Sequence, residues 1–212
     1  MKAVIFDLDG VLVDACEWHY ISLNKALSSV VGINITKEEH ENKYNALPTT
    51  KKLDLLGVSK DDAKKIWKLK QEVTIQTIKD NISIDHEKIE LHNSLRSRGL
   101  KIACVTNSIR KTTELMLEMS GQINLIDYIM TNEDVLRNKP FPDCYNKMVT
   151  EVLGADPKKC IVVEDSPKGI QAAKESVVPD ENIWDVKNSK EVTIKGFNKF
   201  YENLNTNGWG RL

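Results

Sequence analysis

Two aspartates, Asp7 and Asp9, follow a short apolar run near the start of the chain, and their spacing suits them to chemistry. The run covers residues 4–6, and its β-branched and aromatic side chains predict a buried strand. Extended backbone would place both carboxylates on one side and Leu8 on the other. Neighbouring carboxylates repel each other unless a cation or a shared proton lies between them, and hard oxygen ligands favour Mg²⁺. The pattern predicts a metal-assisted site or a simple turn, because Asp and Gly10 also favour turns.

Three more apolar runs have the character of buried strands, at residues 101–106, 128–131 and 160–163, and a shorter one lies at 182–186. Segments with helical periodicity separate these runs. Strands that alternate with helices form right-handed βαβ units and a parallel sheet. The expected fold class is therefore α/β, a Rossmann-like parallel sheet with helices on both faces.

Two of these later strands also end in polar residues. Thr106 and Asn107 lie at the end of the second strand of the chain, and Glu164 and Asp165 follow the fourth. Because the carboxyl ends of parallel strands meet at one edge of a sheet, we expect these side chains to lie beside the two aspartates of the first strand. This convergence favours a functional site over a simple turn.

Residues 15 to about 80 carry helical periodicity and no convincing strand pattern. A long lysine-rich helix is expected over residues 61–82. Its inner side is expected to carry Ile66, Leu69, Val73, Ile75 and Ile78. A helical block of this length between two strand regions predicts an inserted domain. The expected domains are an α/β core of residues 1–14 and 83–212 and an inserted α-helical domain of residues 15–82.

The composition is that of an ordinary globular protein of 212 residues, with 41% hydrophobic and 29% charged residues. The formal net charge of −1 gives no global field for nucleic acid or an anionic membrane, and no apolar run approaches the roughly 20 residues that span a bilayer. The first strand begins so close to the amino terminus that no signal peptide is expected. The cysteines form no Cys-x-x-Cys pair, so we expect reduced thiols and a cytoplasmic location. They are Cys16, Cys104, Cys144 and Cys160.

Four short segments occur in order along the chain: Asp-Leu-Asp-Gly-Val at 7–11, Val-Thr-Asn-Ser at 105–108, Lys-Pro-Phe-Pro-Asp at 139–143 and Val-Glu-Asp-Ser-Pro-Lys-Gly at 163–169. In these segments the chain resembles the haloacid dehalogenase (HAD) superfamily. Within that superfamily it is most similar to the helical-cap branch, which includes β-phosphoglucomutase and phosphoglycolate phosphatase. The resemblance implies a HAD-like core, and it implies that the inserted helical domain is a cap.

The resemblance also implies a role for each acid in these segments. Asp7 would attack the substrate phosphorus and form an aspartyl-phosphate, which splits one displacement into two. Asp9 would protonate the leaving oxygen and then take a proton from water. Dehalogenase members lack this second acid, so phosphate chemistry is favoured over carbon–halogen cleavage. In relatives the counterparts of Asp7, Asp165 and the backbone carbonyl of Asp9 hold Mg²⁺. Glu164 would be either a direct ligand or a residue behind these ligands, and we place it behind them.

Three further residues are expected to bind the substrate phosphate. The Thr106 hydroxyl and the backbone N–H groups that follow it, beginning with Asn107, would bind phosphate oxygens at a helix N-terminus. Lys139 would supply a compact positive charge that balances the transferring group. The alternative for Lys139 is a solvated lysine on a loop.

The resemblance places substrate specificity in the helical cap. The candidates are His19, which aligns with a histidine of β-phosphoglucomutase, and three residues of one loop, Thr50, Lys51 and Lys52. The two lysines would meet a second anionic group of the substrate or form a solvated face. His19 would contact the substrate or be an ordinary packed or exposed residue of its helix.

The predicted function is a Mg²⁺-dependent phosphatase acting on a small phosphorylated metabolite, such as a sugar phosphate or phosphoglycolate. A phosphomutase of the β-phosphoglucomutase type is the alternative, in which a sugar hydroxyl replaces water as the acceptor. A binding protein on a retired enzyme scaffold is a third reading, which the intact catalytic side chains disfavour. We expect a monomer or weak homodimer, with no nucleic-acid or membrane partner. The motifs leave the substrate itself open.

Overall fold

The computed structural model describes residues 2–44 and 47–205, and the chain forms two compact units. One unit combines Met1–Asp14 with Ser83–Leu212, and the other is Ala15–Ile82. The first unit contains the sheet, and the described part of the second consists of helices and their connections. That the second unit serves as a cap domain stays a prediction.

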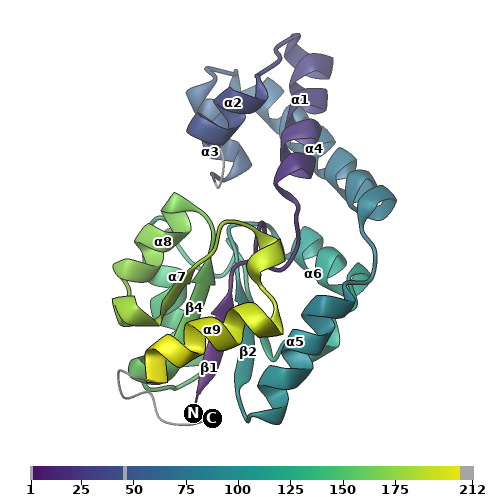
Figure 1. The fold of residues 1–212 in the computed structure, drawn as a ribbon. Coiled ribbons are helices and arrows are strands. Elements are labelled where there is room, and N and C mark those ends of the chain that lie inside the picture. Colours follow the sequence, from purple (N-terminus) through teal and green to yellow (C-terminus); the bar gives the residue numbers. More distant parts are fainter. Residues whose placement is uncertain (1, 45–46, 206–212) are drawn as a thin grey trace. The chain divides into compact units, whose positions relative to one another are not determined.

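Among the described residues, the first unit contains a five-stranded sheet in the order β3-β2-β1-β4-β5, with parallel pairing throughout. Its strands are β1 (Ala3–Phe6), β2 (Lys101–Val105), β3 (Tyr128–Met130), β4 (Cys160–Glu164) and β5 (Ile183–Asp185). The colours in Figure 1 show that strands far apart in the sequence lie side by side, since β1 pairs with both β2 and β4. The predicted α/β fold class is confirmed, and each expected strand is present.

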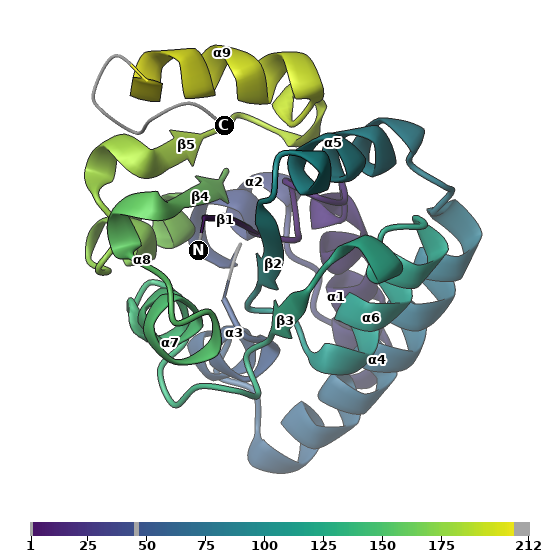
Figure 2. The same ribbon diagram turned by 90° about the horizontal axis from the view of Figure 1, so that it is seen from below.

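Helices lie on both faces of the sheet (Figure 2). One face carries α5 (His86–Ser97), α6 (Arg110–Met119) and α9 (Ile194–Asn205). The opposite face carries α8 (Pro167–Lys174) and α7 (Asp143–Lys147), which continues as a π-helical turn over Met148–Val152. Short 3₁₀ turns occur at Ile123–Leu125, Pro157–Lys159, Asp180–Asn182 and Ser189–Glu191. The chain changes face after β3, where it crosses from the edge of the sheet to β4, as right-handed crossovers require.

The apolar core on the side of α7 and α8 continues directly into polar residues at the carboxyl edge of the sheet. Ile5 of β1 and Val162 of β4 are paired neighbours, and both belong to this core together with Tyr145 of α7. Side chains alternate between the two faces of a strand, so the second residue after each returns to the same side. Asp7 follows Ile5 in this way, and Glu164 follows Val162. The strand period that builds the core therefore also directs these two carboxylates.

A tight turn follows β1 and requires a glycine. The carbonyl of Leu8 accepts hydrogen bonds from the backbone N–H groups of Leu12 and Val13, both at 2.9 Å. Gly10 has φ +92°, in the left-handed region that side chains with a Cβ rarely adopt. A Cβ at this position would also collide with the carboxylate of Asp165. The glycine therefore allows both the turn and the close approach of Asp165.

The second unit is built from α1 (Cys16–Val31), α2 (Lys37–Glu39) with a π-helical turn over His40–Tyr44, α3 (Thr49–Leu55) and α4 (Lys60–Asn81). Its core is a small apolar cluster that includes Leu23 and Leu27 of α1, Leu53 of α3 and Ile66 of α4. Thr36 begins α2 through a capping box, in which its side chain accepts from the Glu39 backbone and the Glu39 carboxylate accepts from the Thr36 backbone.

The predicted inner side of α4 is partly wrong. Ile66 and Ile78 are buried, but the residues between them on the buried line are Lys70 and Thr74. Leu69, Val73 and Ile75 are only half-buried. The line that packs inward has a spacing of four residues, whereas the prediction followed the apolar residue types. Thr74 is accommodated there because its hydroxyl donates to the Lys70 carbonyl at 2.7 Å.

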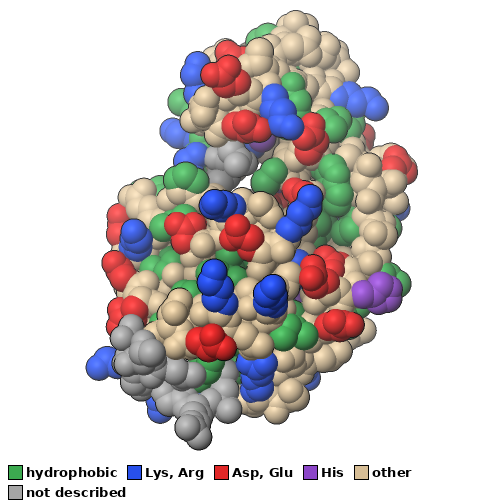
Figure 3. Space-filling view, in the orientation of Figure 1, with side chains coloured by type: hydrophobic (Ala, Val, Ile, Leu, Met, Phe, Trp, Pro, Cys, Tyr) green, Lys and Arg blue, Asp and Glu red, His purple; other side chains and the backbone are tan. Residues whose placement is uncertain are grey.

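The remaining expectations from composition concern the surface and the thiols. All four cysteines are free, and Cys104, Cys144 and Cys160 are buried. Figure 3 shows lysine and arginine side chains interspersed with aspartate and glutamate over the face it displays. Across the described ranges, no helix combines the length and the apolar character needed to cross a membrane.

Candidate active site

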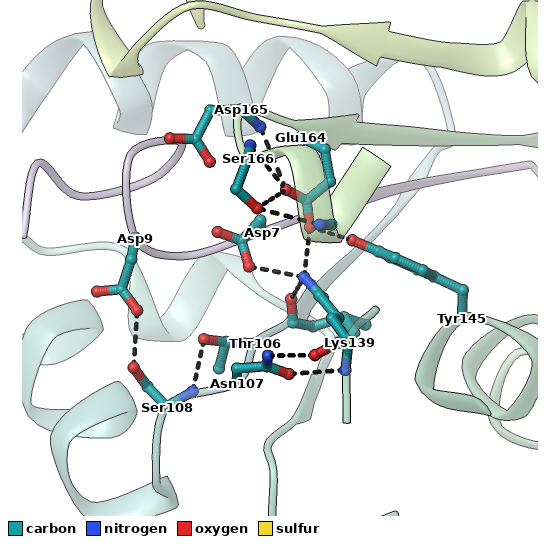
Figure 4. Close-up of polar contacts among 12 residues, drawn as sticks. Asp7, Asp9, Thr106, Asn107, Ser108, Lys139, Tyr145, Glu164, Asp165 and Ser166 are labelled. Carbon is teal, nitrogen blue, oxygen red and sulfur yellow. Dashed lines mark hydrogen bonds and ion pairs between the residues drawn. The ribbon is translucent and has the colours of Figure 1, made fainter. Parts of the chain in front are cut away.

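A buried ammonium group joins two carboxylates at the carboxyl edge of the sheet (Figure 4). Lys139 Nζ donates to Asp7 Oδ1 at 2.7 Å, to Glu164 Oε1 at 2.5 Å and to the Val105 carbonyl at 2.8 Å. All three ammonium hydrogens thus have an acceptor, and only 4% of the residue is exposed. The alternative of a solvated loop lysine is therefore wrong.

The loop that carries Lys139 is fixed by two contacts. Asn107, just after β2, binds the Lys139 backbone twice: its Oδ1 accepts from the Lys139 N–H and its Nδ2 donates to the Lys139 carbonyl, both at 3.1 Å. Arg137 and Asp143 form a two-bond ion pair across the loop, at 2.7 and 3.0 Å. The Asn107 side chain therefore positions Lys139, while its expected contact with phosphate through the backbone N–H stays a prediction.

Glu164 is fully buried and accepts hydrogen bonds on both of its oxygens. Oε1 accepts from the Tyr145 hydroxyl at 2.6 Å as well as from Lys139. Oε2 accepts from the backbone N–H of Asp165 at 3.2 Å and from the backbone and hydroxyl of Ser166 at 3.4 and 3.3 Å. These donors together fix the orientation of the Glu164 carboxylate.

Three carboxylates could hold a metal ion. Ligand oxygens of Asp7, Glu164 and Asp165 all lie within 4.8 Å of one another. Asp165 Oδ1 is buried and has no hydrogen-bond partner, and a buried acceptor without a partner is costly unless an ion or water meets it. An all-oxygen, anionic donor set suits a hard divalent cation such as Mg²⁺. The residues present therefore fit the expected metal.

Asp9 has a different environment from the one that its spacing suggested. Its carboxylate is not part of the three-residue cluster found among the described residues. Asp9 Oδ2 instead accepts from the Ser108 hydroxyl at 2.7 Å. The geometry therefore favours an ion near Asp7 and Asp165, and not between the side chains of Asp7 and Asp9.

Thr106 and Ser108 lie between β2 and α6, at the same edge of the sheet as Asp7, which directly follows β1. Thr106 is buried, and its hydroxyl accepts from the Ser108 backbone N–H at 3.0 Å. Its own N–H donates to the Met130 carbonyl at 3.0 Å, which extends the pairing of β2 with β3. The Thr106 hydroxyl still has its own hydrogen to donate, as a phosphate ligand requires.

The charges of this site are unbalanced. Burial raises the pKa of Asp7 well above its usual value, and Glu164 adds to the rise while Lys139 opposes it. Burial and the nearby Glu164 and Asp9 carboxylates raise the pKa of Asp165 to about 7. For Lys139, burial lowers the pKa, but Asp7 and Glu164 outweigh it and the net change is strongly upward. One ammonium group therefore does not offset the surrounding carboxylates, and a further cation would.

The residues expected to confer specificity lie in the second unit and differ in exposure. Thr50 and Lys51 are exposed, and their expected contact with the substrate stays a prediction. Lys52 is only 6% exposed, so the solvated alternative is wrong for Lys52. Its Nζ lies 3.4 Å from His40 Nε2. Burial and the adjacent Lys52 lower the pKa of His40 to about 3, so this imidazole is neutral.

His19, the remaining candidate, is half-buried on α1. Its Nδ1 lies 3.4 Å from Nζ of Lys70, the buried lysine of α4. The structure thus pairs each of two buried lysines of this unit with an imidazole. Lys70 and His40 were not predicted, because neither lies in a recognisable motif.

A family comparison decides the classification. Residues 4–179 match the model of the haloacid dehalogenase-like hydrolases, which is more than half of the chain. The chain belongs to this family. The expected membership is therefore confirmed, and with it the expectation of a hydrolase.

This hydrolase is similar to two relatives in sequence and to one solved structure in fold. It is 29% identical over 196 residues to a phosphorylated carbohydrates phosphatase of Thermotoga maritima, covering 89% of this chain and 87% of the relative. It is 24% identical over 210 residues to the pyrophosphatase PpaX of Oceanobacillus iheyensis, and the match covers 95% of this chain and 91% of the relative. The β-phosphoglucomutase of Clostridium difficile has the same fold, with a TM-score of 0.79 and 23% identity. The superposition covers 97% of this chain and 99% of the mutase.

Three site residues of this hydrolase were not predicted from the sequence. Ser108 and Ser166 lie inside recognised motifs, next to residues that were assigned, so their polar side chains were an available signal. Tyr145 is an aromatic residue in an apolar helix face, and nothing in its local sequence distinguishes it from a core residue. Its partner Glu164 becomes evident only once α7 packs on the sheet.

The raised pKa of Asp165 predicts a pH dependence of stability in the metal-free protein. The pKa of this carboxyl group is higher in the folded protein, about 7, than the ordinary value of 3.8 expected in the unfolded chain. The free energy of unfolding therefore decreases as the pH rises between these two pKa values. Asp165→Asn removes this dependence. Between pH 4 and pH 8, we expect the free energy of unfolding of the chelator-treated wild type to fall by up to about 4 kcal/mol relative to that of the variant, as measured by urea unfolding.

Asp180→Asn is the matched control, because Asp180 is an exposed aspartate of the same unit. It should follow the wild-type pH profile. If the free energy of unfolding changed with pH in the same way in the wild type and in Asp165→Asn, the pKa of Asp165 would not be raised in the folded protein.

Proposed function

We propose that this hydrolase is a Mg²⁺-dependent phosphatase that acts on a small phosphorylated metabolite through an aspartyl-phosphate on Asp7. The observation that carries the proposal is the position of Asp7, buried at the carboxyl edge of the sheet with Lys139 on one oxygen and Asp165 nearby. Figure 4 shows its second oxygen pointing away from Lys139, so one oxygen is held while the other is available for attack.

The metal would be held by Asp7, Asp165 and the backbone carbonyl of Asp9, as in the family. When bound, Mg²⁺ supplies positive charge that offsets the repulsion between a carboxylate nucleophile and a phosphate dianion. Glu164 is expected behind these ligands, because both of its oxygens already accept hydrogen bonds from the chain.

In the first step, the free oxygen of Asp7 bonds to phosphorus while the bond from phosphorus to the ester oxygen breaks. Asp9 donates its proton to that leaving oxygen, which otherwise departs poorly. The Ser108 hydroxyl, at 2.7 Å from Asp9 Oδ2, would orient the acid. In the second step, Asp9 takes a proton from water, the water oxygen bonds to phosphorus, and Asp7 is released with inorganic phosphate.

Three residues would meet the phosphoryl group during transfer. The Thr106 hydroxyl and the backbone N–H of Asn107 would donate to its oxygens. Lys139 stays beside Asp7 as negative charge moves from the carboxylate to the transferring group, so its ammonium stabilises both. Fixed donors of this kind reorganise little during the reaction, which is why they lower the barrier.

The helical unit, residues 15–82, is proposed to act as the cap that selects the substrate. The name of the Thermotoga maritima relative supports a phosphorylated carbohydrate as the substrate class. Lys52 and Lys70, each beside an imidazole, would suit a substrate with a second anionic group. His19, Thr50 and Lys51 stay candidates for the same role.

Asp7→Asn should abolish phosphate release from p-nitrophenyl phosphate in the presence of Mg²⁺. An amide cannot form the acyl phosphate, so we expect kcat to fall by at least about 10³-fold. Asp180→Asn, on the exposed surface, should retain wild-type activity. Absence of turnover by the wild type across a panel of phosphate esters would count against the phosphatase and favour a retired scaffold.

Asp9→Asn should discriminate between leaving groups. We expect kcat/KM, which reports the steps up to the aspartyl-phosphate, to fall by about 10²- to 10⁴-fold for an alkyl phosphate such as a sugar phosphate. For p-nitrophenyl phosphate the loss should be under about tenfold, because nitrophenolate leaves without a proton. Equal losses for both esters would exclude Asp9 as the proton donor.

The products that the wild type forms from a sugar phosphate distinguish a phosphatase from a mutase. A phosphatase releases inorganic phosphate, whereas a mutase transfers the phosphoryl group to a second hydroxyl.

A further inference from the structure

Tyr145 on α7 contacts both members of the buried pair formed by Lys139 and Glu164. Its hydroxyl donates to Glu164 Oε1 at 2.6 Å, the oxygen that also accepts from Lys139 Nζ. Lys139 Nζ lies 4.9 Å from the centroid of the Tyr145 ring, within the range of a cation–π interaction. Tyr145 itself is fully buried, so its hydroxyl has no access to water as a replacement partner.

The hydrogen bonds of Glu164 distinguish this carboxylate from the neighbouring Asp165. Its two oxygens are occupied by donors from Tyr145, Lys139, Asp165 and Ser166. Asp165 Oδ1, in contrast, is buried without a partner. Glu164 still lies within 4.8 Å of the ligand oxygens of its neighbours, close enough to become a direct ligand if its present bonds were weakened.

We propose that Tyr145 is a positioning residue that holds Glu164 on Lys139 and so keeps Glu164 from binding the metal directly. This inference rests on the metal site of the proposed function. Mg²⁺ requires a compact octahedron of about six ligands, whereas Ca²⁺ accepts roughly six to eight oxygens in a looser shell. An additional carboxylate therefore favours Ca²⁺, and the Tyr145 hydroxyl maintains selectivity for Mg²⁺.

The test is Tyr145→Phe, which removes the hydroxyl and keeps the ring beside Lys139. Titration calorimetry with Mg²⁺ alone and Ca²⁺ alone gives the ratio of the two dissociation constants. We expect this ratio to shift toward Ca²⁺ by about tenfold, the size typical of losing an outer partner of a metal ligand. In the double variant Tyr145→Phe with Glu164→Gln, the shift should disappear, because the carboxylate that would join the ion is absent.

Tyr128→Phe is the matched control, since Tyr128 packs on the same core from β3. It should leave the ratio unchanged. An unchanged ratio in folded Tyr145→Phe, with or without a lower melting temperature, would overturn the proposal and leave Tyr145 a purely structural residue. Absence of ion binding by the wild type would be a different failure, because it would remove the metal site of the proposed function.

A second measurement does not depend on the folding of the variant. A buried hydroxyl proton bound to a carboxylate exchanges slowly and gives a low-field NMR signal. In the wild type, the proposal predicts that the Tyr145 hydroxyl signal persists when Mg²⁺ is added to saturation. Loss of that signal on Mg²⁺ binding would show that Glu164 leaves Tyr145 for the ion, and would overturn the proposal.

Discussion

The buried ammonium group of Lys139, bound to two carboxylates, is the interaction on which the rest of the site depends. Asp7 directly follows β1, Glu164 ends the adjacent strand β4, and Lys139 lies in the loop after β3, so this one group joins three separate segments. Breaking such a pair costs about 3–5 kcal/mol, because a charge is left buried without compensation. The same group binds one oxygen of Asp7, while the other oxygen points away from it.

The core and the site share one physical origin. Alternation along β1 and β4 buries Ile5 and Val162, and the next residues on that side are Asp7 and Glu164. Parallel pairing then brings the ends of these strands together at one edge, where open α/β sheets bind their ligands. Burial raises the pKa of both Asp7 and Asp165, and the neighbouring Glu164 carboxylate raises each of them further. A bound metal ion would offset these carboxylate charges, so the feature that destabilises the apo site would also favour binding of a cation.

Apolar runs separated by helical segments were sufficient to predict a parallel sheet and the polar residues at its carboxyl edge, because both signals are local in the sequence. They were insufficient where a side chain chooses between partners that come from other elements. The bond from Ser108 to Asp9 and the bond from Tyr145 to Glu164 both join segments far apart in the chain. In the helical unit, burial of Lys70 depends on how α4 packs, which residue type alone does not specify.

Every role proposed for the other residues of the site presupposes that the Asp7 carboxylate accepts the phosphoryl group. The most direct measurement is acid quenching of the enzyme during turnover of p-nitrophenyl phosphate with Mg²⁺, followed by borohydride reduction and peptide mass spectrometry. Reduction converts an aspartyl-phosphate to homoserine, so we expect homoserine at position 7 and at no other aspartate. Turnover with no modified residue, or with the modification at Asp9 or Asp165, would contradict this role of Asp7.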